Sequence, residues 1–228
     1  MAKIDTWLNN QLPDIKRNLT VEKGLDFLHI STSPTIKKMR PRIGERQMKA
    51  EDRTIPRICG SETLVGCIYG HSGIHRQSMD AAFGEFDWDG TITVYKLNAD
   101  NFVRPSNSLV PDATRTKELW IVPYSPETYE VTTRKVGMMV VAHATEEVLA
   151  GEVIEKNLFY LQVVEPFIVD DEEFPKGLYS FRIDGGLFLT SDKKQKPNPI
   201  YDVRTIAPGL WNETIAKMKK IHATRKSA

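Results

Sequence analysis

The sequence has few cysteines, almost no net charge and no long apolar run, and each of these absences excludes a class of protein. The two cysteines, Cys59 and Cys67, are too few for a disulfide framework. No apolar run approaches the roughly 18 residues of a membrane span, and residues 1–10 lack the apolar segment of a secretory signal. A net charge of +1 creates no overall attraction to nucleic acid or acidic membranes. We therefore expect a cytoplasmic protein with reduced thiols and no membrane association.

Internal repeats and low-complexity tracts are also missing, which excludes a repeat protein. With 228 residues, 40% of them hydrophobic and 27% charged, the chain can bury one sizeable core or two small ones. Alternating or short apolar runs predict strands at 25–32, 55–60, 91–97, 118–123, 128–136, 158–164 and 178–183. The pattern predicts an α+β fold with a strand-rich mixed or antiparallel sheet, few short helices and a C-terminal helix.

Residues typical of helix ends and turns predict where some of these elements begin and end. Ser61 is the expected N-cap of a short helix that Gly70 ends, and Asp184-Gly185-Gly186 is the expected turn of a hairpin. Two prolines predict a loop over residues 100–114, and an apolar stripe predicts the C-terminal helix at 209–222.

Three regions are expected along the chain. Residues 1–24 form an N-terminal arm with apolar residues at helical spacing until Pro13, and we expect it to dock rather than to belong to the core. Residues 25–136 form the first main region. A change of composition after Gly137 sets apart residues 137–228 as a β-rich accessory region with the terminal helix.

The first candidate site is a histidine and a hydroxyl at the end of the strand predicted at 25–32. Because side chains alternate along a strand, His29 and Ser31 share one face and could together bind a ribose or an amide. The alternative is a partly buried histidine that bonds to the backbone. Further along, Glu118 would share a face with Trp120, and it would be functional on the inner side of a cleft or a surface residue on the outer side.

A basic connector over residues 37–57 is the second candidate. Arg42 and Arg57 each follow a proline, and guanidinium groups bind phosphate through paired hydrogen bonds, so these two could hold a pyrophosphate. The alternative is that the connector arginines are solvated or pair with Glu45, Glu51 and Asp52.

Metal-binding patterns are weak. The i, i+4 pair His71 and His75 with Cys67 has zinc-like donors, but Ser72-Gly73 between the histidines favours a loop, so we predict no metal site. Cys59 and Cys67 are expected to be small buried hydrophobic residues rather than nucleophiles.

Taken in chain order, these segments resemble the ADP-ribosyltransferase superfamily of the His-Tyr-Glu type. His29-Ile30-Ser31 is similar to its first motif, and Arg57 to Ser61 followed by Leu64 to Tyr69 is similar to its second strand and helix. Thr116 to Trp120 is similar to its late strand, with Glu118 in the catalytic position. The resemblance covers about residues 25–136. The sequence also resembles uncharacterised bacteriophage proteins.

The resemblance implies NAD as the substrate and a macromolecule, protein or nucleic acid, as the target. It also implies a role for each motif residue: His29 and Ser31 hold ribose, Arg42 and Arg57 hold phosphate, Tyr69 flanks the nicotinamide, and Glu118 orients a ribose hydroxyl.

The alternative is a non-enzymatic phage accessory or virion protein, located in the host cytoplasm or the virion. It is favoured by Cys59, which stands where the family has an aromatic residue. The acidic tract at 146–173 and the basic C-terminal tail would suit a homo-oligomer or a virion partner.

Overall fold

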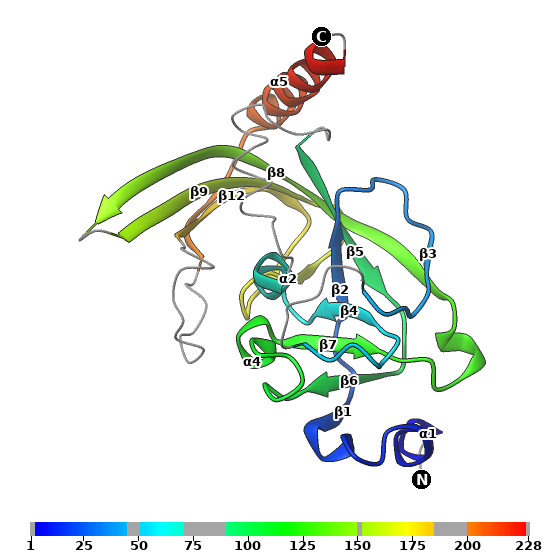
Figure 1. Cartoon of the computed structure of the whole chain (residues 1–228). Helices are drawn as coiled ribbons and strands as arrows, with labels where there is room; N and C mark the ends of the chain where they lie inside the picture. The colour runs from blue at the N-terminus through cyan, green and yellow to red at the C-terminus, as the bar shows by residue number, and fades with distance from the viewer. Residues whose placement is uncertain (1–2, 45–50, 71–89, 150–151, 185–199, 227–228) are drawn as a thin grey trace.

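One large antiparallel sheet organises the molecule (Figure 1). The computed structural model describes residues 3–44, 51–70, 90–149, 152–184 and 200–226. The strand order is β1-β6-β7-β4-β2-β5-β8-β9-β12-β13, and β3 pairs with β8 beside this path. Helices cover parts of the sheet rather than alternating with its strands, so the predicted α+β class is confirmed.

The strands of this sheet are β1 (Leu19–Lys23), β2 (Leu28–Ser31), β3 (Lys38–Met39), β4 (Ile58–Ser61), β5 (Thr91–Leu97), β6 (Asn101–Pro105), β7 (Glu118–Ile121), β8 (Val131–Leu149), β9 (Glu152–Val163), β12 (Gly177–Asp184) and β13 (Tyr201–Thr205). β10 (Phe167–Ile168) and β11 (Glu173–Phe174) form a separate pair. The helices are α1 (Lys3–Gln11), α2 (Leu64–Gly70), α4 (Ala113–Thr116) and α5 (Pro208–Lys226), with short 3-10 turns at Lys16–Asn18 and Pro126–Thr128.

Every predicted strand corresponds to an observed one, but the loop predicted over 100–114 is wrong. That segment holds β6 and α4. β6 pairs along its whole length with β1, which the sequence did not reveal, and this pairing stabilises a strand that ends at Pro105. The hairpin predicted at 184–186 and the His71–His75 pair fall outside the described residues.

The N-terminal segment contributes to the core instead of only docking on it. Ile4 and Leu8 of α1 are each 1% exposed and pack in a cluster with Trp120 of β7. The helix ends at Gln11, before Pro13, as the missing proline N–H requires.

The boundary predicted at 136/137 falls inside β8. This strand pairs with β5 from Thr91↔Val140 to Leu97↔Thr133, and with β9 on its other side. The two predicted regions therefore share one continuous sheet.

The two faces of this shared sheet are covered by different helices. Met139 and Val141 point toward the cluster beneath α2, whereas Val140 between them packs against Trp211 and Met218 of α5. This is the alternation expected of a strand that is buried on both faces. It also places the predicted stripe of the C-terminal helix against the sheet.

The helix after β4 begins two residues later than predicted. The Thr63 side-chain oxygen accepts a hydrogen bond from the Gly66 N–H at 3.0 Å, which makes Thr63 the N-cap of α2 in place of Ser61. Ser61 instead donates to the Thr116 carbonyl at 2.8 Å. It therefore joins β4 to α4.

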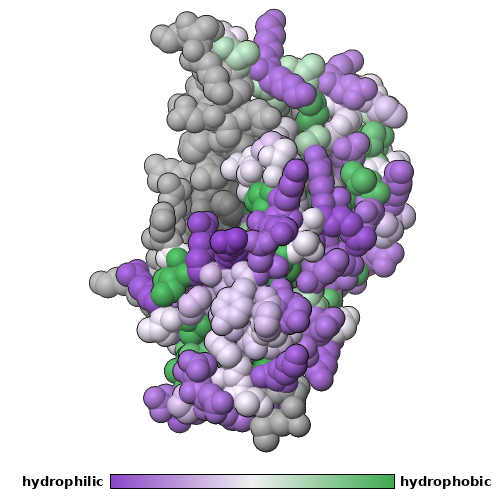
Figure 2. All heavy atoms as spheres, turned by 90° about the vertical axis from the view of Figure 1, so that its right-hand side faces the viewer, coloured by the Kyte–Doolittle hydropathy of each residue, from purple (hydrophilic) through white to green (hydrophobic). Residues whose placement is uncertain are grey.

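The surface in Figure 2 is mostly hydrophilic over its described part, and hydrophobic side chains are scattered there in small areas. Within the described ranges, no helix is both long and apolar enough to cross a membrane.

Candidate functional site

A pocket of about 290 Å³ opens where β2, β4 and β7 meet the connector and α2. Its volume is at the lower end of the roughly 300–1,000 Å³ that small-molecule sites occupy. Five of the six residues proposed from the sequence lie in its lining: His29, Arg42, Arg57, Tyr69 and Glu118. Ser31 does not line it, and its side-chain oxygen accepts a hydrogen bond from the Ser33 N–H at 3.1 Å.

His29 lines the pocket from β2, one residue beyond the position where this strand pairs with β4. β2 pairs with β4 only at Leu28↔Ser61, so the two strands separate beyond this point. Alternation directs Leu28 and Ile30 toward the cluster under α2 and His29 to the other face. The His29 Nδ1 lies 3.0 Å from the Cys59 carbonyl oxygen, across the gap between the strands.

Glu118 comes from β7, on the other side of β4. It is paired in register with Ser61 and is 9% exposed. The indole N–H of Trp120, two residues later on the same face, donates to Glu118 Oε1 at 2.6 Å. Of the two alternatives left open by the sequence, the structure has Glu118 on the inner side of a cleft.

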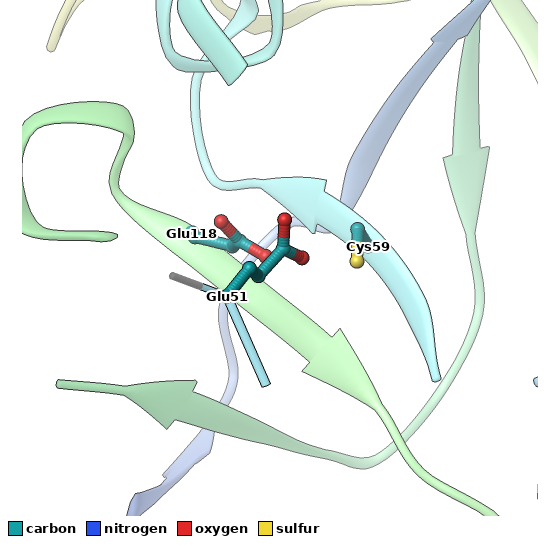
Figure 3. Close-up of side chains that lie close together, drawn as sticks. All are labelled: Glu51, Cys59 and Glu118. Atoms are coloured by element: carbon teal, nitrogen blue, oxygen red, sulfur yellow. The ribbon is translucent and has the colours of Figure 1, made fainter. Parts of the chain in front are cut away.

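Two further acceptor groups lie beside Glu118 (Figure 3). One carboxylate oxygen of Glu51, one of Glu118 and the Cys59 Sγ all lie within 4.8 Å of one another. The pKa of Glu118 is raised to about 7, chiefly by burial and also by the negative charges of Glu51 and Asp112, while the Trp120 hydrogen bond and Arg57 oppose the shift. The pocket can therefore supply a proton donor and acceptor near neutral pH.

Cys59 is not the buried hydrophobic residue that the sequence suggested. It is exposed to the pocket, whereas Cys67 is buried as predicted. Both thiols lie among protein atoms on most sides, and desolvation raises the pKa of each, with the Glu118 charge acting in the same direction. Cys59 is thus the more accessible thiol but a weakly ionised one.

Arg57 is held in place by protein groups. Its side chain is 1% exposed, and its Nη2 donates to a Glu51 carboxylate oxygen at 2.5 Å and to the Asp52 carbonyl at 3.0 Å. The guanidinium carbon stacks 4.2 Å from the centre of the Trp120 ring. The ion pair considered as an alternative for this arginine is therefore present.

Arg42 lines the pocket from the connector, and Tyr69 lines it from α2. Arg42 exchanges two backbone hydrogen bonds of 3.1 Å with Arg57, and Arg42 is exposed at the pocket mouth. Tyr69 is 4% exposed in the last turn of α2, and the guanidinium of Arg115 lies 5.1 Å from its ring centre.

Sequence reasoning missed two acidic residues in the lining, Glu51 and Asp112. Desolvation raises the pKa of Asp112, and the neighbouring Glu51 charge adds to this effect. Neither residue lies in a motif, and each comes from a connecting segment that only the fold brings to the pocket. The signal for Glu51 in the sequence was its position as an acidic residue within the basic connector, and this suggested an ion pair.

The donor set of Glu51, Cys59 and Glu118 has the chemistry of a divalent-cation site. However, the Arg57 guanidinium already lies against Glu51, and it supplies the positive charge that a metal would bring. The arrangement is therefore better suited to acid–base chemistry than to holding a metal.

Charge is distributed unevenly over the pocket. Three carboxyl groups, those of Glu51, Asp112 and Glu118, line it beside the buried Arg57, while Arg42 and Arg40, the latter paired with Glu130, are exposed. A ligand with a cationic end and an anionic end would match this polarity. Comparison of the chain with protein-family models, with curated proteins and with solved structures finds no match.

Proposed function

We propose that this pocket binds NAD and that the protein transfers ADP-ribose from NAD to a macromolecular target. The observation that carries the proposal is that one pocket is lined by His29, Tyr69 and Glu118, residues far apart in the sequence. His29 and Glu118 stand at motif positions of the superfamily that the sequence resembles, and Tyr69, one helix after the position of the family's aromatic residue, would act in its place.

The distribution of charge over the pocket favours one orientation of bound NAD. The nicotinamide ring of NAD is cationic and its pyrophosphate is anionic, so the ring would enter the acidic interior and the phosphates would stay at the arginine-lined mouth. A volume of about 290 Å³ would enclose the nicotinamide ribose and leave the adenosine half outside.

The roles proposed for individual residues follow from their positions. His29 and Glu118 would bind hydroxyls of the ribose, Tyr69 would contact the nicotinamide, and Arg42 would hold phosphate. Arg57 is engaged with Glu51, so we propose that it supports the acidic wall instead of binding phosphate. Ser31 would act only at the edge of the site.

A non-enzymatic binding protein is the second candidate. It is favoured by the engagement of Arg57 and by the thiol at position 59, because both remove a ligand contact expected of the enzyme family. Such a protein would bind a nucleotide at the pocket without converting it.

NAD titration of the purified protein tests the proposal. At a concentration 100 times its Kd, a ligand specific for the folded state stabilises it by about 2.7 kcal/mol. For a chain of this size, that corresponds to a rise in Tm of about 5–10 °C. NAD should also slow the reaction of Cys59 with a maleimide, because this thiol lines the pocket and Cys67 is buried.

The enzymatic part is tested by nicotinamide release. Glu118→Gln should lower release by about 100-fold or more, as expected for loss of a transition-state contact. The matched control Glu213→Gln changes an exposed residue of α5 and should have no effect. NAD binding without nicotinamide release would favour the non-enzymatic candidate. If NAD neither raised Tm nor protected the Cys59 thiol, NAD would be refuted both as a substrate and as a bound ligand.

A further inference from the structure

Glu51 and Glu118 form a pair of carboxyl groups that line the pocket and are held by different partners. An oxygen of each lies within 4.8 Å of the other, and Figure 3 shows the two side chains pointing toward one another. Both line the cavity, so a small molecule that enters it meets both groups. The roles proposed above use Glu118 and leave Glu51 without one.

A continuous set of contacts fixes this pair. The Arg57 guanidinium donates to Glu51 at 2.5 Å and to the Ile55 carbonyl at 3.1 Å, and it stacks 4.2 Å above the Trp120 ring. The Trp120 N–H in turn donates to Glu118 at 2.6 Å. The chain Glu51–Arg57–Trp120–Glu118 therefore sets both carboxyl groups on a rigid, buried support, which is the kind of preorganisation that catalytic groups require.

The two carboxyl groups have unlike surroundings. Glu51 is paired with the Arg57 guanidinium, whereas Glu118 has a neutral indole donor and is nearly buried. Desolvation raises the pKa of Glu118 to about 7, in line with a division of roles between the pair. Unlike environments of this kind commonly separate the acid, base and electrostatic roles of paired carboxyl groups.

We propose that Glu51 is the general base that deprotonates the acceptor, and this inference rests on the proposed transfer of ADP-ribose. In the step, the C1′–N bond to nicotinamide breaks, and its electron pair leaves with the neutral nicotinamide. The acceptor oxygen of water or of a target hydroxyl forms the new bond to C1′, and the proton of that oxygen goes to the Glu51 carboxylate. Glu118 remains on the ribose hydroxyls.

Water and methanol as acceptors test this assignment without knowledge of the target. With saturating NAD, nicotinamide release and methyl ADP-riboside formation are measured for the wild type, Glu51→Gln and Glu51→Ala. Loss of a general base should lower kcat by about 100- to 10,000-fold. The Kd for NAD should change by less than about threefold, because Glu51 is assigned to the acceptor. Added formate should raise the rate of Glu51→Ala at least tenfold by replacing the carboxylate.

The matched control is Glu62→Gln, which removes a carboxylate that accepts from Arg104 at 2.8 Å outside the pocket. It should leave kcat unchanged.

The outcomes separate the two proposals. If the wild type releases nicotinamide and Glu51→Gln does so equally fast, the general-base assignment is refuted while the proposed function stands. If Glu51→Gln loses NAD affinity and formate does not restore Glu51→Ala, Glu51 only supports Arg57, which also overturns the assignment. If the wild type neither binds nor cleaves NAD, the proposed function fails, and the assignment fails with it.

Discussion

At the scale of single residues, Glu118 carries most of the site's unusual chemistry. A carboxyl group that is 9% exposed needs a partner, and among the described residues Glu118 accepts from a neutral donor, the indole N–H of Trp120. Glu51 and Asp112 face it with negative charge, and Arg57 faces it with positive charge. Because Arg57 is already paired with Glu51, it compensates for this burial only partly.

This environment predicts a stability that depends on pH. The pKa of Glu118 is about 7 in the folded protein and near 4.5 when the chain is unfolded. Between these values the folded state holds a proton that the unfolded state has released, so the free energy of unfolding falls as pH rises from about 4.5 to about 7. The fall should be at most about 3 kcal/mol.

Urea unfolding at pH 5 and pH 8 measures the effect. In Glu118→Gln, the free energy of unfolding should differ less between pH 5 and pH 8 than it does in the wild type. In Glu213→Gln, this difference should be the same as in the wild type. A Glu118→Gln protein whose stability changed with pH as much as the wild type would contradict the assigned burial of this carboxyl group.

At the scale of elements, the close approach of α2 to β4 and α4 forms one wall of the pocket. A glycine at position 66 permits it, because a Cβ there would lie 2.2 Å from both the Ser61 side-chain oxygen and the Thr116 carbonyl oxygen. Those two atoms are themselves joined by the Ser61 hydrogen bond of 2.8 Å. A side chain at position 66 would therefore force three elements apart.

Gly66→Ala should accordingly destabilise the protein, even though alanine favours helix formation. Overpacking against backbone and a buried hydroxyl costs about 1–3 kcal/mol, which a shift of the urea midpoint would reveal. Gly209→Ala in α5 is the matched control, because no atom lies within 4 Å of the added Cβ, and its stability should be equal or slightly higher. Equal stabilities of Gly66→Ala and the wild type would show that α2 can move away without loss.

At the scale of the whole molecule, β8 joins the two regions that the sequence separates. It pairs with β5 in one and with β9 in the other, and α2 and α5 pack on its two faces. Pairing and packing that cross the boundary couple the two regions energetically, so we expect them to unfold together.

Trp211 offers a test of this coupling. Trp211→Ala removes a side chain that is 6% exposed from the cluster around Val140, and should cost about 3–5 kcal/mol. In a Cys59→Ser background, the reaction of buried Cys67 with a thiol reagent reports on the first region. The urea midpoints of Cys67 exposure and of circular dichroism should shift together.

Leu210→Ala, at a position that is 41% exposed, should change neither midpoint by much. A Cys67 midpoint that stayed at its wild-type value while the circular dichroism midpoint moved would mean that the two regions unfold separately.

The sequence by itself determined the class of the fold and most of its elements. Alternation and short apolar runs depend on local geometry alone, so strands such as β5 and β7 and the terminal helix could be predicted from them. The same local alternation placed Glu118 and Trp120 on one face. It failed for β1 and β6, because these strands are stabilised by pairing with one another and carry little local signal.

Only the tertiary structure decided how the site is composed. It brings Glu51 and Asp112 into a pocket with residues from β2, β4 and β7, exposes Cys59 there, and engages Arg57 in an ion pair. It also carries β8 through the boundary expected at 136/137. The physical reason is range: the pocket joins residues between positions 29 and 118, and β8 pairs with β5 residues 36 to 49 positions away, contacts that no local pattern encodes.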